Sequence, residues 1–104
     1  MEQLQNLQDL QCDSNQLQAL PESLGALLNL KYLDCSKNQL QSLPEGLGKL
    51  QHLEYLDCSA NQLQSLPDSL AALPKLKTLD TRSNLFANVP PALRQKEGLE
   101  FIER

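Results

Sequence analysis

The side chains that could carry out chemistry are few and recur at a constant interval. Cys12, Cys35 and Cys58 are 23 residues apart, and His52 is the only histidine among the 104 residues. A zinc site usually takes cysteines from a CxxC pair or from ligands that converge, and a nucleophile needs a base beside it. Neither pattern is visible, and there is no glycine-rich phosphate loop. We therefore predict a protein that is not an enzyme and has no catalytic residue, cofactor or metal ligand.

Carboxylates follow the same interval, at Asp34, Asp57 and Asp80. Three carboxylates in a flat row do not surround a cation with the six or more oxygens that calcium takes, so we expect no metal there. The net charge is −4 and the isoelectric point is about 4.8. Nucleic-acid binders need clustered positive charge, so this class is excluded. No apolar run approaches the roughly 20 residues that span a bilayer, and we expect no membrane partner.

The whole chain repeats with a period of 23 residues. It contains 25 leucines but only two phenylalanines. Asparagine keeps the period at Asn15, Asn38, Asn61 and Asn84, and proline keeps it at Pro21, Pro44, Pro67 and Pro90. Agreement across this many columns indicates a repeat architecture. We divide the single domain, residues 1–104, into a lead-in and successive units: 1–6, 7–29, 30–52, 53–75, 76–98 and a partial unit 99–104.

Each unit reads L-x-x-L-x-[CT]-x-x-N-x-[LF]-x-x-[LV]-P-x-x-L. With this pattern the sequence resembles the leucine-rich repeat family, best over residues 30–40 and 53–63. The resemblance implies an α/β solenoid: a right-handed coil with a parallel sheet of about five strands on its concave face. Irregular or short helical return segments would form the convex face. It also implies a cytoplasmic protein-interaction or scaffold role, while delivery into a host cell as an effector stays open.

The residues themselves favour a strand at the start of each unit. Leu33 and Cys35 alternate with Tyr32, Asp34 and Ser36, which is the two-residue period of a half-buried strand. The proline in the second half forbids a regular strand there, so we expect a loose helical or extended return. One unit cannot bury its own leucines, whereas stacked units bury them and pair their strands in parallel about 4.8 Å apart.

Two repeated columns have structural explanations. An asparagine where the chain leaves the strand can bond to the turn of its own and the adjacent unit, so we predict a structural ladder of Asn15, Asn38, Asn61 and Asn84. Stacked cysteines would lie about 4.8 Å apart with parallel side chains, whereas a disulfide needs Cβ atoms about 3.8 Å apart. We therefore predict that Cys12, Cys35 and Cys58 are free, buried thiols, which suits a reducing compartment.

The outward strand positions are the candidates for binding. One column holds Asp9, Tyr32, Tyr55, Thr78 and Phe101, and the next holds Gln11, Asp34, Asp57, Asp80 and Glu103. Tyrosine is a good anchor because it supplies contact area at low entropy cost. The acidic column would suit a basic partner, although such acidic positions are also ordinary in this family. The predicted partner-binding residues are Tyr32, Asp34, Tyr55, Asp57, Asp80, Arg82 and Phe101.

The leading hypothesis is a non-enzymatic module that binds a protein partner through its concave strand face. A minimal or designed stack that self-associates through uncapped ends is an alternative. A substrate-recruiting fragment of a larger protein is another. The partner's identity does not follow from the sequence.

Overall fold

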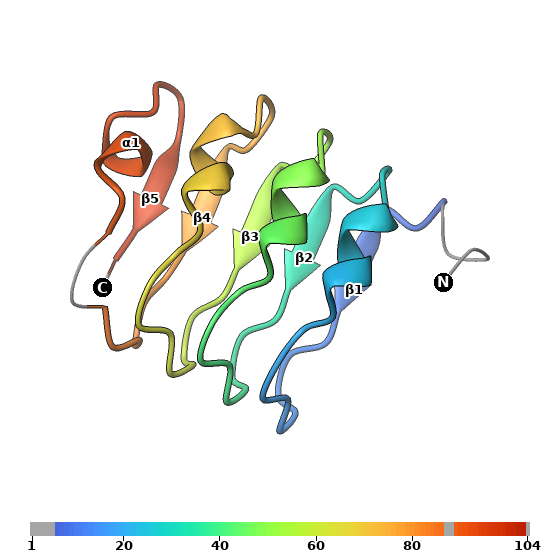
Figure 1. Cartoon of the computed structure of the whole chain (residues 1–104), viewed down its shortest axis with the longest axis vertical. Coiled ribbons are helices and arrows are strands. Elements are labelled where there is room, and N and C mark those ends of the chain that lie inside the picture. The colour runs from blue at the N-terminus through green and yellow to red at the C-terminus, as the bar shows by residue number, and fades with distance from the viewer. Residues whose placement is uncertain (1–5, 87–88, 104) are drawn as a thin grey trace.

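The computed structural model describes residues 6–86 and 89–103. Its five strands form one parallel sheet in chain order, β1 to β5. Each strand contains three residues, and a short helical turn lies between each strand and the next (Figure 1). The strands are β1 Asp9–Gln11, β2 Tyr32–Asp34, β3 Tyr55–Asp57, β4 Thr78–Asp80 and β5 Glu100–Ile102. The five parallel strands that the sequence predicts are confirmed.

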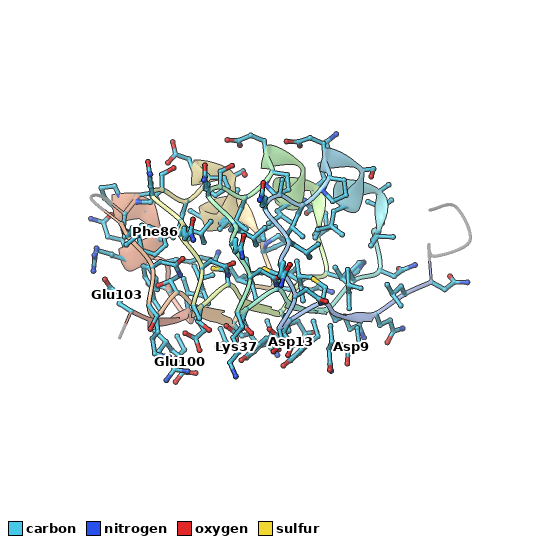
Figure 2. All side chains as sticks on the ribbon, turned by 90° about the horizontal axis from the view of Figure 1, so that it is seen from below. Asp9, Asp13, Lys37, Phe86, Glu100 and Glu103 are labelled. Atoms are coloured by element: carbon cyan, nitrogen blue, oxygen red, sulfur yellow. The ribbon has the colours of Figure 1, made fainter. Side chains whose placement is uncertain are left out.

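The return segments are 3-10 turns, which the sequence left undecided between helical and extended. They are η2 Glu22–Ala26, η3 Glu45–Lys49 and η4 Asp68–Ala72, and the last return forms the α-helical turn α1, Pro91–Arg94. A proline precedes each 3-10 turn in extended conformation and has no N–H to leave unpaired. The helical turns all lie on one side of the sheet, so the other side, here called the strand face, is left open (Figure 2).

The core lies between the sheet and the helical turns and is made of leucine columns. Leu33, Leu56 and Leu79 of the central strands have no exposed surface, and Leu47 and Leu70 of the turns are equally buried. Neighbouring turns approach closely because glycine stands between them. A Cβ atom on Gly25 would lie 2.5 Å from the carbonyl oxygen of Gly46, and one on Gly48 would lie 2.5 Å from the Cβ of Ser69.

The last strand is displaced by one residue from the predicted register. Glu100 pairs with Thr78, and Phe101 pairs with Leu79. The prediction that Phe101 continues the tyrosine column is therefore wrong. One residue fewer lies between Pro90 and the strand than in earlier units. Lys96 replaces the leucine that earlier units bury at that point, so the return has no side chain to place in the core there.

Each unit has a residue in the left-handed backbone region just before its asparagine. These residues are Ser14, Lys37, Ala60 and Ser83, with φ between 54° and 59°. None of them is a glycine or an asparagine, the usual residues with positive φ, so sequence patterns gave no sign of this turn. The conformation is held by backbone hydrogen bonds between units, in which the N–H of Ala60 donates to the carbonyl of Arg82 at 2.8 Å.

Substituting Ala60 by glycine should raise the free energy of unfolding. The left-handed conformation costs an alanine about 1–2 kcal/mol, and the extra freedom of glycine in the unfolded chain offsets part of this gain. We expect a net increase of about 0.5–1 kcal/mol in denaturant unfolding. The same substitution at Ala72, which ends η4, should instead reduce stability. A loss of stability in both variants would contradict the strain at Ala60.

In the described part of the chain, no helix is long and apolar enough to cross a membrane.

Candidate interaction site

The two tyrosines stack on each other on the strand face. Tyr32 and Tyr55 begin β2 and β3 and are paired in register. Their ring centroids are 4.5 Å apart and their planes differ by 2°, so the rings are parallel and stacked. Strand spacing is close to this distance, and identical positions in adjacent units therefore bring the rings into contact. Both side chains are half-buried, and they present an aromatic surface on the open side of the sheet.

Both phenols have a raised pKa. Loss of hydration raises the pKa of Tyr55 to about 12, with further contributions from the charges of Asp57 and Asp80. The pKa of Tyr32 is raised by the same effect of burial and by the charge of Asp34. Ionising either ring would place a phenolate beside carboxylates that are already charged.

Spectrophotometric titration should therefore find Tyr55 still protonated at pH 10 and Tyr32 less than half ionised, whereas a free tyrosine is half ionised at that pH. Because the folded pKa exceeds the unfolded one, this contribution to stability is present below about pH 10 and is lost as the pH rises further. Asp57→Asn should lower the midpoint of Tyr55. Two midpoints near pH 10 in the folded protein would contradict the described environment.

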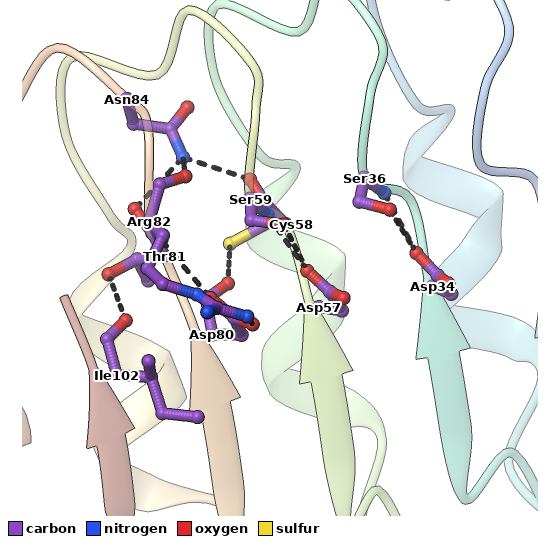
Figure 3. Close-up of polar contacts among 10 residues, drawn as sticks. All are labelled: Asp34, Ser36, Asp57, Cys58, Ser59, Asp80, Thr81, Arg82, Asn84 and Ile102. Carbon is purple, nitrogen blue, oxygen red and sulfur yellow. Dashed lines mark hydrogen bonds and ion pairs between the residues drawn. The ribbon is translucent and has the colours of Figure 1, made fainter. Parts of the chain in front are cut away.

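Asp34 and Asp57 end their strands with equivalent hydrogen bonds. Oδ1 of Asp34 accepts the N–H of Ser36 at 3.0 Å and its hydroxyl at 2.6 Å. Oδ1 of Asp57 accepts the same two groups of Ser59 at 3.0 and 2.7 Å (Figure 3). One oxygen of each carboxylate thus fixes the turn that follows the strand. No contact of the other oxygen is found within the described residues.

Asp80 differs from these two residues although the sequence places it in the same column. Nε and Nη2 of Arg82 donate to its two carboxylate oxygens at 3.0 and 2.6 Å (Figure 3). Asp80 is only 2% exposed. Burial acts to raise the pKa of this carboxyl, but hydrogen bonds from Arg82 and its positive charge outweigh burial and lower it. Asp80 is a neutralised, buried carboxylate, and Arg82 is its half-exposed partner.

Phe101 lies apart from the tyrosines. It is partly buried against the core, and the guanidinium carbon of Arg94 lies 5.8 Å from its ring centre. Glu100 takes its place in the tyrosine column, which the sequence did not predict. The single available signal was Lys96 in a leucine position.

The asparagine side chains connect consecutive units. Nδ2 of Asn61 donates to the carbonyls of Cys35, Cys58 and Ser59 at 3.0–3.1 Å, and its Oδ1 accepts the N–H of Leu40 at 3.0 Å. Asn38 and Asn84 make the equivalent bonds to their own and the preceding unit. Asn15 bonds to carbonyls of its own unit, those of Cys12 and Asp13.

All three cysteines are free. Cys35 and Cys58 have no exposed surface, and burial raises the pKa of both thiols. Cys12 is only partly buried, so the predicted burial is wrong there, because among the described strands β1 has a neighbour on one side only, β2. His52 is on the surface with Nδ1 3.3 Å from Nζ of Lys75. No three metal-ligating side chains converge in residues 6–86 and 89–103.

The family is decided by comparison with known sequences. A profile described as a leucine-rich repeat region matches residues 6–103, which is nearly the whole chain. The chain belongs to the leucine-rich repeat family. Its sheet, helical turns and asparagine ladder are thus those of a leucine-rich repeat solenoid. None of the curated proteins matches the sequence.

Solved leucine-rich repeat structures share this fold. A leucine-rich repeat protein of Leptospira interrogans is 32% identical, with a TM-score of 0.83 over 92% of this chain. A functional domain of InlJ from Listeria monocytogenes, described as including a cysteine ladder, is 31% identical with a TM-score of 0.80 over 97%. A chain in the Toll–Spätzle complex of Drosophila is 27% identical, with a TM-score of 0.77 over 93% of this chain. The chain spans only 25%, 21% and 13% of those chains, in that order.

Proposed function

We propose that this leucine-rich repeat domain is a protein-binding module whose strand face contacts the partner around Tyr32 and Tyr55. The observation that carries this proposal is the stacked tyrosine pair, which is half-exposed on the strand face. No helical turn covers this side of the sheet (Figure 2). A rigid aromatic pair loses little conformational freedom when a partner binds. The neighbouring Asp34 and Asp57 provide charge for orientation.

The comparisons support the general role. One similar structure is a complex of two proteins, Toll and Spätzle. The fold leaves one face of a regular parallel sheet uncovered by helical turns, and side chains on that face can vary without disturbing the leucine core. We further propose a reducing compartment, because the free, buried thiols of Cys35 and Cys58 suit one.

A capture experiment tests the binding face. The immobilised domain and its Tyr32→Ala/Tyr55→Ala variant are exposed to lysate from the source organism, and bound proteins are identified by mass spectrometry. The double variant should lose the partner, because truncation removes the central aromatic contacts. Glu45→Ala on the helix side is the matched control and should keep it. Loss in the control with retention in the tyrosine variant would refute the assignment.

Self-association is a second candidate, favoured by the end of the sheet at β1. Leu7, Leu10 and Leu17 are partly exposed, whereas the equivalent leucines of the next two units are buried. A second copy stacked on this end would bury them. Sedimentation velocity should then show association that Leu7→Lys abolishes and the tyrosine variant leaves intact. A monomer at all concentrations would exclude it.

A further inference from the structure

Each of the two stacked tyrosines has an outer ring face that the other ring does not cover. The inner faces of Tyr32 and Tyr55 cover each other at a centroid distance of 4.5 Å. The outer face of Tyr32 is directed toward β1, where Asp9 is its register partner. The outer face of Tyr55 is directed toward β4, where Thr78 is its register partner. The two outer faces therefore have different register partners, one acidic and one neutral.

The charges around the two faces differ in the same sense. Asp9 is exposed, and its charge reaches Tyr32, as do those of Asp34 and Asp57. On the opposite side, the half-exposed guanidinium of Arg82 interacts electrostatically with Tyr55 and Asp57. The first side therefore attracts a cation, whereas on the second side the positive charge of Arg82 offsets the negative charges of Asp57 and Asp80. Lys37 also projects from this face, but from the turn after β2, five residues beyond Tyr32 (Figure 2).

We propose that the outer face of Tyr32, together with Asp9 and Asp34, is a subsite for an arginine side chain in an extended basic segment of the protein partner. This inference rests on the proposed function, since it names the partner chemistry of the same face. Asp80 is outside the subsite because both its oxygens are bound by Arg82. Of the acidic column, Asp34 thus belongs to the subsite and Asp80 does not.

Arginine fits this position better than lysine. Its guanidinium is planar and stacks on an aromatic ring, so it would continue the row of parallel rings by one more layer. That layer would lie over β1, because the ring separation of 4.5 Å is close to the spacing between strands. There the guanidinium edge would meet Asp9, whose carboxylate can accept two parallel hydrogen bonds. The ammonium group of lysine is not planar, so it can neither stack on the ring of Tyr32 nor donate two parallel hydrogen bonds to the carboxylate of Asp9.

Tyrosine fluorescence provides a reading from the site itself. The chain contains two tyrosines and no tryptophan, so all its emission comes from the stacked pair. The probe is a synthetic peptide in which arginine alternates with serine, without aromatic residues. Matched peptides carry lysine, citrulline or glutamate in place of arginine. Citrulline keeps the shape of arginine but not its charge, and lysine keeps the charge but not the plane.

We expect the arginine peptide to bind most tightly. The lysine peptide should bind several-fold more weakly and the citrulline peptide at least about tenfold more weakly. Tyr32→Leu should weaken arginine binding about tenfold, with Tyr55 left as the reporter. Asp9→Asn should weaken it about threefold. Glu100→Gln is the matched control, an acid of the same column on the far side of the pair, and should change nothing.

Three results would overturn the inference. They are equal binding of the arginine and lysine peptides, equal effects of Asp9→Asn and Glu100→Gln, and no fluorescence response to the arginine peptide. Each of these leaves the proposed function standing if the captured partner still depends on Tyr32 and Tyr55. Failure of the proposed function has a different sign, namely a captured partner that is indifferent to the tyrosines.

Discussion

Asn61→Ala should lower the free energy of unfolding by about 3 kcal/mol. The change removes an amide that donates to three carbonyls and accepts one N–H, and these backbone groups lie in the interior between two units. The N–H of Leu40 then has no other acceptor within the described residues, and a buried group in that state costs about 1–3 kcal/mol. The three carbonyls each keep another donor, from Asn38, Asn84 and Lys37, so the loss of their bonds to Asn61 adds a smaller cost. Chemical denaturation followed by circular dichroism measures the difference.

Two further variants make the result specific to the ladder. Gln62→Ala alters the next residue, which is exposed, and should change stability by less than about 0.5 kcal/mol. Asn15→Ala should cost about 1 kcal/mol, since Asn15 is exposed and its bonds among the described residues go to its own unit. If Asn61→Ala and Gln62→Ala are equally stable, the ladder does not hold the units together.

Gly25→Ala should destabilise the protein by about 2–3 kcal/mol. The added methyl would lie 2.5 Å from the carbonyl oxygen of Gly46, which is backbone and cannot rotate away. Units one and two would have to separate at η2 and η3, and overpacking of this kind typically costs about 1–3 kcal/mol. The separation would also strain the hydrogen bond from Gly46 N–H to Oε1 of Glu22, now 2.9 Å long. Thermal and denaturant unfolding measure the loss.

The control is the same substitution where space is free. A Cβ on Gly98 meets nothing within 4 Å, so Gly98→Ala should cost only about 1 kcal/mol, from its φ of +78°. Gly48→Ala should also reduce stability, because the added methyl meets the side chain of Ser69. Combining it with Ser69→Gly should recover much of the stability lost in Gly48→Ala. Equal losses at Gly25 and Gly98 would show that the turns have room to move apart.

The exact repeat was sufficient to predict the leucine core and the pairing of the first four strands. The period fixes which leucines are buried, which strands pair, and why Tyr32 lies beside Tyr55. It failed where a unit departs from the period. The displacement of β5 follows from a shorter return, and a sequence ruler that assumes equal units places Phe101 on the wrong face.

Side-chain pairing was the other limit. The column position of Asp34, Asp57 and Asp80 is the same, yet their environments differ. The residue two positions later is serine after Asp34 and Asp57 but arginine after Asp80. A column shows where a carboxylate stands but not what neutralises it. The left-handed turn at Ala60 was also hidden, because backbone hydrogen bonds between units impose it on a residue that does not favour it.

The residue two positions after each of these aspartates sets the charge that its unit exposes on the strand face. With serine there, the unit shows a carboxylate to its surroundings, and with arginine the same carboxylate is withdrawn and a guanidinium shown instead. Neither choice touches a leucine. Single substitutions at these positions could therefore change the surface charge of one repeat unit at a time during evolution. The range of partners would change while the leucine core stayed the same.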